Sequence, residues 1–460
     1  MRFSFVARVA AGFAVALVAA GAGGAAGAAG ASGATGTVGA GGSVGSAAAR
    51  GTGGTLGTGG AAGAAGASGA TGFSGATGLG ASGGGAPSGT RPAGPTSSPP
   101  GDQVYSFGDV GGGFGGKIVA LEHDVPTPVR GIPDPVVQIA TSNSDSYALT
   151  SSGTVWAWGA GGVGELGNAR TSDYTRRPVE VLFPPGVRIS FLANPMPYDS
   201  AIAVDMHGHA WGWGFNWSHT LCLAGTVVEI PEQLPLSDVT LATGAGTHSL
   251  FDAGGHVVAC GTNHAGALGN GTTAGAALPT PVIGLPSGHI AALESSWQGS
   301  GALMDDGSYY DWDFNHGGQL GDGTTANSSL PVRVQLPAPV VEVSQGGSRP
   351  SNGQTLAVLA DGSVWAWGTG RLGQLGIGSY RNQTQPVRID VPNGVRFVEV
   401  ASGGDASYAL DRAGQLWAWG GDHAGQLGDG LRGIGLDLPF RVGLQLTQIS
   451  ATATNVAALG

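Results

Sequence analysis

Short stretches in which bulky and small residues alternate recur six times along the chain, each beginning three residues after a turn glycine. The clearest is Trp365-Ala366-Trp367-Gly368, which follows the pair Asp361-Gly362. An Asp-Gly pair favours a two-residue hairpin turn, and a period of two places alternate side chains on opposite faces of a strand. The stretches begin at Trp156, Trp211, Val258, Tyr310, Trp365 and Trp417, at steps of 55, 47, 52, 55 and 52 residues. A period near 50 residues predicts a repeat architecture.

A second pattern follows these stretches and completes a unit of four short strands. It runs from a Gly-Gln-Leu-Gly turn through a polar loop to a strand that contains proline, at Gly318–Val334, Gly373–Ile389 and Gly425–Val442. Proline cannot donate a ladder hydrogen bond, so this last strand belongs at the edge of a sheet. Four short strands per unit, repeated around an axis, predict the blades of an all-β propeller.

The two ends of the repeat region supply the halves of one further unit. Tyr105–Gly108 fits the aromatic strand but has no hairpin partner before it, and Ile449–Gly460 resembles the first half of a unit. Joined, these halves make a seventh blade. The sequence therefore predicts a seven-bladed β-propeller closed by pairing of its N-terminal and C-terminal strands, which removes the exposed edges of an open ring.

These units resemble the regulator of chromosome condensation repeat family over roughly Asp102–Gly460. The resemblance rests on the Trp-Ala-Trp-Gly strand, the Gly-Gln-Leu-Gly-Asp-Gly turn and the Pro-Val loop taken together. The pattern is broken at Asn216–Cys222 and reduced to glycines at Gly111–Gly116, so the second and first blades should be the least regular. The family includes a eukaryotic nuclear nucleotide-exchange factor and secreted bacterial propellers such as a β-lactamase inhibitory protein. The resemblance, which we place with the secreted bacterial type, therefore implies a fold and a binding habit rather than one function.

The first 22 residues predict a secretory signal peptide. Arg2 and Arg8 precede an apolar run from Val9 to Ala20, and small residues stand at Ala20 and Ala22, in the order of charged region, apolar region and Ala-x-Ala site that such signals have. The run is shorter than the roughly 20 residues of a membrane span, and no later segment approaches one. We expect a secreted or cell-surface protein without an integral span in the mature chain. An alanine-rich tract that imitates a signal is the alternative.

Residues 23–101 read as a low-complexity stalk and a linker into the globular domain, residues 102–460. From Gly21 to Gly78, glycine fills every third position except Ala48, 19 of 20 slots, which is the spacing of a collagen triple helix. The tract has no proline to pre-organise that helix, so we interpret it as a disordered, flexible spacer. Under the collagen-like alternative it would hold three propellers together as a trimer. Pro-rich Arg91–Gly101 forms the linker.

Charge argues against nucleic acid as a partner. Of the 19 basic residues in the chain, four precede Asp102, which leaves the propeller with 15 basic and 30 acidic residues, a net charge of −15. An acidic surface repels the phosphates whose neutralisation dominates nucleic-acid affinity.

The chain offers no recognisable catalytic, cofactor or metal motif. Three of its ten histidines share one repeat slot and therefore read as turn residues rather than catalytic ones: His264, His316 and His423. His207 and His209 flank a hairpin turn, but nothing supplies a third ligand at a recognisable spacing. We expect no cofactor and no metal.

The two cysteines, Cys222 and Cys260, fall in neighbouring units. Export would permit a disulfide, and the pairing needs Cα atoms within about 7 Å of each other. The sequence leaves open whether they form that disulfide or stay two separate buried thiols.

If the protein binds through its loops, the candidates are the positions where the repeat is broken. One variable loop per blade, before the second strand, should gather near the axis on one face. This axial set offers Tyr198, His248, Trp297, Arg349 and Asp405. A second set, in the loops after the Gly-Gln-Leu-Gly turns, offers Tyr174, Arg176, Arg177, Tyr380 and Arg381, with Trp217 in the irregular blade. Aromatic and arginine side chains dominate interface hot spots, although most of these residues could equally be exposed or pack locally. Trp217 and Trp297 are the strongest candidates because they lie outside the tryptophan slots of the repeat strands.

The sequence favours an exported, non-catalytic binding scaffold that presents propeller loops to a protein or glycan partner. One alternative is an inhibitor that blocks a secreted enzyme, like the bacterial propellers that the chain resembles. Another is an enzyme acting on cell-wall polysaccharide, which would need a cleft with paired carboxylates of perturbed pKa. Asp305/Asp306 and Asp311/Asp313 are such pairs, but their places in a hairpin turn and a strand favour a structural role.

Overall fold

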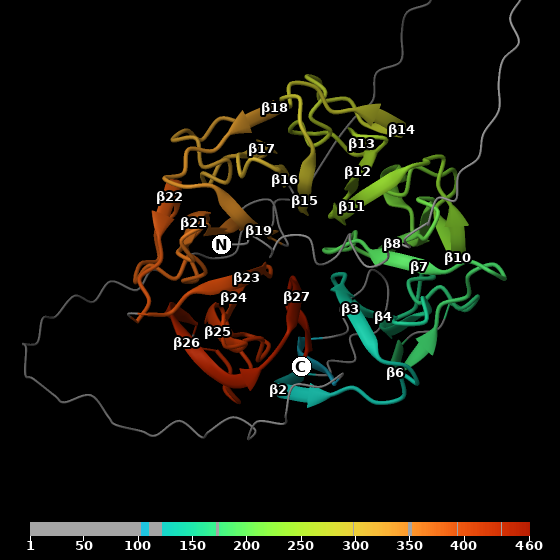
Figure 1. Ribbon diagram of the computed structural model, residues 1–460, viewed down its shortest axis with the longest axis horizontal. Coiled ribbons are helices and arrows are strands. Elements are labelled where there is room, and N and C mark those ends of the chain that lie inside the picture. Colours follow the sequence, from blue (N-terminus) through green and yellow to red (C-terminus); the bar gives the residue numbers. More distant parts are fainter. Residues whose placement is uncertain are drawn as a thin grey trace, which may run out of the picture. The chain divides into compact units, whose positions relative to one another are not determined.

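Seven four-stranded antiparallel sheets form a ring in the computed structural model (Figure 1), which confirms the predicted all-β, seven-bladed propeller. The structure describes residues 103–109, 122–171, 174–297, 299–347, 352–392, 394–433 and 435–460. The predictions for the signal peptide (1–22), the stalk and linker (23–101) and the Gly111–Gly116 loop lie outside these residues. Within the described ranges, no helix is long and apolar enough to cross a membrane.

Each sheet is one blade, with its first strand nearest the axis and its fourth at the rim (Figure 1). Three consecutive blades are β3 (Val136–Thr141), β4 (Asp145–Thr150), β5 (Val155–Ala160) and β6 (Tyr174–Glu180); β7 (Ile189–Leu192), β8 (Ser200–Asp205), β9 (Ala210–Phe215) and β10 (Val227–Gln233); β11 (Val239–Ala245), β12 (His248–Ala253), β13 (His256–Gly261) and β14 (Ala276–Pro281). The next three are β15 (Ile290–Ser296), β16 (Gly299–Met304), β17 (Tyr309–Asp313) and β18 (Ser328–Arg333); β19 (Val340–Gly346), β20 (Gln354–Leu359), β21 (Val364–Gly368) and β22 (Gln383–Arg388); β23 (Phe397–Ser402), β24 (Ala406–Asp411), β25 (Gln415–Gly420) and β26 (Leu436–Gln445).

The seventh blade joins the two ends of the repeat region, as predicted. Its strands lie in the order β27 (Gln448–Thr452), β28 (Asn455–Leu459), β1 (Val104–Asp109) and β2 (Glu122–Pro128). β1 pairs with β28 from Val104 opposite Leu459 to Gly108 opposite Asn455. This pairing closes the ring because it gives each terminal strand the partner that an open propeller would lack.

Antiparallel pairing sorts the connections of every blade onto two faces of the ring. The loops between first and second strands and those between third and fourth strands share one face, which we call the loop face. The hairpin turns between second and third strands, and the links between blades, lie on the opposite face. Both predicted sets of binding loops therefore belong to the loop face, one set at the axis and the other toward the rim.

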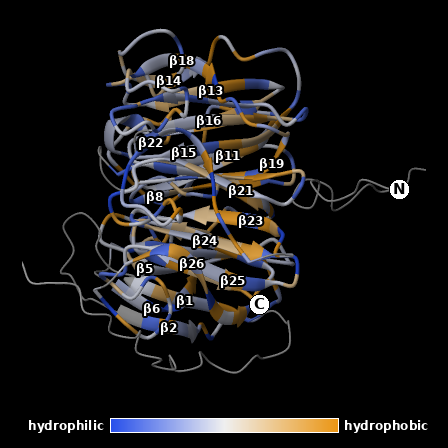
Figure 2. Cartoon of the chain, turned by 90° about the vertical axis from the view of Figure 1, so that its left-hand side faces the viewer, coloured by the Kyte–Doolittle hydropathy of each residue, from blue (hydrophilic) through white to orange (hydrophobic). Residues whose placement is uncertain are grey.

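Buried tryptophans fasten four of the blades to the blade before them. Viewed from the side, hydrophobic segments run along strands such as β23 and β25 (Figure 2). The third strands of four blades carry a fully buried indole: Trp213, Trp312, Trp367 and Trp419. Each donates its Nε1–H to a backbone carbonyl in the turn of the preceding blade, at 2.8 to 2.9 Å; for Trp419 the acceptor is Gln374.

The second glycine of that turn lies directly against the indole. A Cβ atom added to Gly376 would come within 2.7 Å of Trp419 Nε1, and one on Gly321 within 2.9 Å of Trp367. Contacts below 3.0 Å do not occur without displacement of one partner. The Gly-Gln-Leu-Gly motif is thus the receiving surface for the tryptophan of the next blade.

Side chains on the innermost strands add links around the axis. Gln138 on β3 both accepts from the Leu192 N–H and donates to the Leu192 carbonyl of the next blade, each at 2.8 Å. The Ile449 N–H donates to Glu399 at 2.8 Å, and the Ile139 N–H donates to Gln448 at 3.0 Å. These bonds satisfy edge groups of strands that no further strand covers.

The second blade is irregular, as predicted, and is joined to its neighbour by a disulfide. Its loop forms a short 3-10 helix, Trp217–His219, and ends at Cys222. Cys222 and Cys260 are bonded, with Cα atoms 5.6 Å apart, so the choice that the sequence left open is settled in favour of pairing. The loop of this blade is therefore anchored to β13 of the next.

Two alanine substitutions in one turn separate the indole contact from backbone conformation. Gly376 and Gly378 have nearly equal positive φ, +66° and +67°, but a Cβ on Gly378 would meet only Leu438 at 3.6 Å. We expect Gly378→Ala to cost about 1–2 kcal/mol, the penalty of left-handed backbone. Gly376→Ala should cost roughly 1–3 kcal/mol more, because it also displaces Trp419. Urea unfolding of both variants measures the difference, and equal losses would show that the indole contact is dispensable.

Candidate functional site

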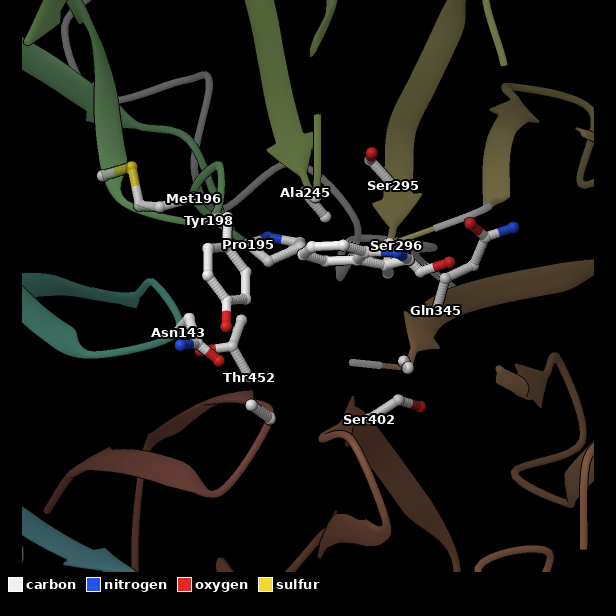
Figure 3. Close-up of a pocket in the computed structure, with 15 residues that line it drawn as sticks. Asn143, Pro195, Met196, Tyr198, Ala245, Ser295, Ser296, Gln345, Ser402 and Thr452 are labelled. Carbon is white, nitrogen blue, oxygen red and sulfur yellow. The ribbon is translucent and has the colours of Figure 1, made fainter. Parts of the chain in front are cut away.

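The loops of all seven blades meet at the axis on the loop face and enclose a hollow. Its lining contains at least one residue from each blade: Asn143, Pro195, Met196, Tyr198, Ala245, Gly246, Ser295, Ser296, Trp297, Gln345, Gly346, Gly347, Ser402, Thr452 and Ala453. Figure 3 shows Asn143, Tyr198, Gln345, Ser402 and Thr452 around this axial hollow. The predicted gathering of one loop per blade is confirmed.

The axial hollow is small and carries no charge. Its volume is about 30 Å³, enough for water, whereas small-molecule sites measure about 300–1,000 Å³. None of its lining residues is ionisable except Tyr198. Such a surface suits contact with a partner that lies across it better than enclosure of a substrate.

Tyr198 and Trp297 form the aromatic centre of this surface. Their rings meet edge to face with centroids 4.8 Å apart, a favoured geometry for aromatic pairs, and both side chains are partly exposed. A Cβ on Gly246 would come within 2.7 Å of the Trp297 carbonyl oxygen. The loop between β11 and β12 therefore packs against the backbone of Trp297. Tyr198 and Trp297 both lie at the axis, where the sequence analysis expected them.

A second depression joins Trp217 to this centre. We call it the aromatic groove; its lining is Tyr198, Asp199, Ser200, Phe215, Trp217, Thr220, Gly246, Thr247 and Trp297. Trp217 is 49% exposed at its edge. The two tryptophans singled out from different loop sets thus line one groove, which the sequence did not predict.

His248 does not belong to the exposed surface, and its assignment there is wrong. It is 1% exposed, and its Nε2 lies 2.8 Å from Ser300 Oγ and 3.1 Å from Ser295 Oγ. Burial lowers the pKa of its imidazole to about 4, against a smaller opposing effect of the Gly299 backbone. His248 is a neutral packing residue beneath the axial hollow.

Two residues of the axial set remain, and the structure describes only one of them, Asp405. Asp405 is partly exposed, accepts a hydrogen bond from Asn352 Nδ2 at 2.8 Å and lies 3.7 Å from His423 Nε2. Arg349 lies outside the described residues. Asp405 therefore belongs to a local polar contact beside the axis, and it is absent from the lining of the hollow.

The second set lies toward the rim of the loop face. Tyr174 begins β6 and is partly exposed, and Arg176 and Arg177 beside it are exposed. Tyr380, 53% exposed, and Arg381 lie in the loop before β22. None of these residues lines the hollow or the groove, so they are candidates for peripheral contacts only.

Buried carboxyl groups beneath the loop face are the main feature that sequence reasoning missed. Gln345, in the wall of the hollow, donates through Nε2 to Asp311 at 2.9 Å and to Tyr309 Oη at 2.8 Å, and its N–H donates to Glu294 at 3.1 Å. Burial raises the pKa of Glu294 and Asp311 well above the ordinary range. Neighbouring acids add to this effect, Asp311 on Glu294 and Asp313 on Asp311. Burial also raises the pKa of Asp313 to about 7. The sequence held one sign of these buried acids: Asp311 and Asp313 stand where the other repeat strands have alanine and glycine.

A second acidic cluster lies between the blades of β3–β6 and β7–β10. Ser144 Oγ donates to both Asp145 and Asp199, at 3.2 and 3.3 Å. Burial, with nearby Glu165 and Asp199, raises the pKa of Asp145 well above its usual value; burial raises that of Glu165 to about 7. The sequence signal was Glu165 in the glutamine slot of the turn. No group of three or more His, Cys, Asp or Glu side chains among the described residues could hold a metal ion.

The pairs proposed for a polysaccharide-acting enzyme occupy two different environments. Asp305 and Asp306 are exposed in the hairpin turn on the opposite face, where Asp306 accepts from the Ser308 N–H at 2.8 Å. Asp311 and Asp313 are 1% and 3% exposed. Neither pair faces the axial hollow.

The structure is a β-propeller whose loop-face surface is built from one loop per blade, which is consistent with a protein-binding scaffold. Residues 306–348 and 361–410 match the model of the Regulator of chromosome condensation (RCC1) repeat. The chain is 27% identical over 339 residues to the ultraviolet-B receptor UVR8 of Arabidopsis thaliana, covering 72% of this chain and 75% of that protein. It is 31% identical over 248 residues to the human E3 ubiquitin-protein ligase HERC2, covering 52% of this chain but 5% of that protein. The chain therefore contains repeats that match this family's model and is similar to proteins that carry such repeats.

Solved structures show the same fold. Human WBSCR16 superposes with a TM-score of 0.67 at 18% identity, over 78% of this chain and 98% of that one. Prp20p of Saccharomyces cerevisiae gives 0.66 at 20% identity, over 78% and 92%. At these identities the likeness concerns the fold.

Buried and half-buried carboxyl groups with raised pKa predict that stability falls as pH rises. The pKa is raised to about 7 in Glu165 and Asp313 and to about 8 in Glu342 and Glu399, so between pH 5 and 8 the folded chain binds more protons than the unfolded chain and unfolding becomes easier. His248 has the opposite effect on the free energy of unfolding below pH 6.5, because its pKa is lowered on folding. It is one group, and the carboxyl groups that act in the other direction are several. Urea unfolding at pH 5, 6.5 and 8 should give a decreasing free energy of unfolding; an increase over this range would contradict the burial of these acids.

Asp313 should be replaceable by glycine with a gain in stability. Its φ is +100°, in the slot where other blades have glycines such as Gly368 and Gly420 at +95° and +101°. Asp313→Gly should add about 1–3 kcal/mol by relieving this backbone conformation, with a larger gain at pH 8, where the buried carboxyl ionises. Asp313→Asn keeps the unfavourable backbone conformation and removes the charge. It should therefore remove the part of the pH dependence of stability that Asp313 causes, without the gain expected from relief of the backbone. Thermal unfolding of both variants at two pH values tests this, and destabilisation by glycine would refute it.

Proposed function

We propose that this protein is an exported, non-catalytic scaffold that recognises a protein partner through the loop face, with Tyr198 and Trp297 at the centre of the contact. The observation that carries the proposal is the convergence of seven loops on a partly exposed aromatic pair over a hollow of about 30 Å³. Rigid aromatic side chains near the middle of an interface are typical hot spots. The signal-like pattern of residues 1–22 supports export.

The named structures support protein recognition as the general mode. Prp20p is described by its binding to Gsp1p and histones, and Kap60 is described as bound to yeast RCC1. At 20% identity, these partners are not transferred to this chain. A secreted enzyme that the loop face blocks is one kind of partner that the proposal includes.

A glycan is the second candidate, favoured by the chemistry of the hollow. Its polar lining consists of hydroxyl and amide groups, including Asn143, Ser295, Ser402 and Thr452, and contains no charged side chain. Hydroxyl and amide groups beside an aromatic ring can satisfy the hydroxyls of an uncharged sugar while the ring packs on its apolar face. This arrangement would serve recognition without hydrolysis.

Capture from the medium and surface of the producing cells tests the proposal. We expect Trp297→Ala to weaken binding of the captured protein by about tenfold or more, since hot-spot truncations cost about 2 kcal/mol or more. Tyr380→Ala removes an aromatic group at the rim that is more exposed than Trp297, and it should leave capture unchanged.

The measurement is the affinity of each full-length variant for the identified partner. Capture that survives Trp297→Ala but is lost with Tyr380→Ala would move the site to the rim. Binding to isolated cell-wall polysaccharide that Trp297→Ala abolishes, without any protein captured, would favour the glycan.

A further inference from the structure

One sector of the outer wall of the propeller carries no charged side chain. Residues 253–293 contain no Asp, Glu, Lys or Arg over 41 positions, although about one residue in eight of the propeller is charged. The outer part of this run, residues 270–289, comprises the loop before β14, β14 itself and the link to β15, and every one of its residues is exposed or half-buried. We call residues 270–289 the uncharged sector; His289 is its only titratable side chain.

β14 differs from the other six fourth strands, which lie with it at the rim of the ring (Figure 1). Each of those six carries at least one charged residue, such as Glu229 and Glu232 in β10 and Arg333 in β18. β14 reads Ala-Ala-Leu-Pro-Thr-Pro. Its Leu278 is 69% exposed, more than any other large hydrophobic residue that the structure describes. Charges commonly protect exposed edge strands from association, and β14 lacks that protection.

The apolar surface continues from the uncharged sector onto the next blade. Ile283 and Leu330 are 49% and 41% exposed. A Cβ atom on Gly271 would lie 3.6 Å from Ile283 Cδ1 and 3.6 Å from Leu330 Cδ2, so both side chains border this glycine. The Gly271 N–H donates to the Ser329 carbonyl at 2.9 Å, which fixes the loop to β18. The exposed apolar side chains of two blades therefore form one continuous surface, as interaction sites do.

We propose that the uncharged sector is the contact surface between two copies of this protein, which form a two-fold symmetric dimer. The proposal does not depend on the proposed function, because no residue of the sector lines the axial hollow or the aromatic groove. A contact at the rim leaves the loop face of each copy accessible to its own partner.

Charge favours a second copy as the occupant of this surface. The propeller carries 30 acidic and 15 basic residues, so two copies repel each other in most relative orientations. The repulsion is smallest where neither surface is charged, and a two-fold axis brings the same sector to both sides of the contact. A cationic partner would instead be attracted to the acidic remainder of the surface.

The size of the uncharged sector and its prolines suit a closed dimer that is held by side chains. A stable interface uses about 20–30 residues a side, and the sector provides 20, with Leu330 beside it. Pro279 and Pro281 have no N–H to donate, so β14 is a poor template for a further strand. The contact is therefore made by apolar side chains rather than by extension of the sheet, and a two-fold contact of this kind closes on itself.

Sedimentation velocity of the full-length oxidised protein over a wide range of concentration tests the proposal. We expect a reversible equilibrium between monomer and dimer. The dimer should become tighter as salt is added, because salt screens the repulsion between two acidic chains. A contact held by ion pairs would become weaker instead.

Two matched substitutions locate the contact. Leu278 and Leu438 stand at the same position before the proline of β14 and β26, and they are 69% and 50% exposed. Leu278→Glu would bring two like charges into the contact and should raise the dissociation constant of the dimer at least about tenfold. Leu438→Glu adds the same charge outside the contact and should leave that constant unchanged. Because both leucines are exposed, both variants should fold, which urea unfolding checks.

Hydrogen exchange gives a second readout of the same contact. Formation of the dimer should slow exchange of the amides in residues 270–289 and leave those of β26 unchanged.

Several outcomes would overturn the proposal. A protein that stays monomeric at every concentration would do so, as would a dimer that salt weakens. A dimer or trimer that Leu278→Glu leaves unchanged would place the association elsewhere, and the trimer would point to the Gly-X-Y tract of residues 21–78. Equal loss of association in both variants would assign the effect to net charge. Dimer formation without capture of a partner through Trp297 would leave this inference standing while the proposed function falls; capture by a monomer would give the reverse.

Discussion

The contact between a buried indole and the turn of the preceding blade is the constraint on which this propeller depends. It combines a hydrogen bond from Nε1 to a carbonyl with close packing against a glycine, as at Trp419, Gln374 and Gly376. The contact couples neighbouring blades near the loop-face ends of their third strands, where Trp367 and Trp419 are the next-to-last residues of β21 and β25. Loops at the ends of the blades are then free to vary in sequence while their positions remain fixed. A rigid ring with variable loops is an effective way to hold a composite surface in one geometry, because little conformational freedom is lost on binding.

The variation on the loop face is concentrated where the repeat is most disturbed. Trp297 sits in the loop of the blade that also carries Asp311 and Asp313, and Trp217 sits in the blade whose turn is replaced and tied by a disulfide. Residues that break a local rule without improving packing are expected at functional positions. Asp313 occupies a glycine conformation, and Ser218 and His219 adopt positive φ beside Trp217. Ser218 and His219 therefore lie next to a residue that lines the groove, whereas Asp313 belongs to the same blade as Trp297.

The sequence was sufficient for the fold because each structural requirement has a local signature. The period near 50 residues, the Asp361-Gly362 turn and the half units at the two ends predicted seven blades and their closure. The sequence also predicted that the loops carrying Tyr198 and Trp297 would gather near the axis on one face, but not that the two rings would touch. The burial of His248 could not be read in the same way, because its slot, the first position of a second strand, holds residues as different as Asp145 and Ala406. The pairing of Cys222 with Cys260 and the groove between Trp217 and Trp297 depend on distances between blades, which the spacing of residues along the chain does not encode.

Buried acids beneath the loop face fix the orientation of a side chain that lines the axial hollow. Gln345 lines the axial hollow, yet both hydrogen bonds of its amide nitrogen go to Tyr309 and Asp311 beneath it. Its orientation therefore depends on groups that a partner on the loop face never touches. Because burial raises the pKa of Asp311 well above the ordinary range, the carboxyl stays protonated under conditions in which a surface aspartate is ionised. A neutral Asp311 allows the hollow to remain uncharged on a propeller of strongly acidic composition, which is what recognition by aromatic, hydroxyl and amide groups requires.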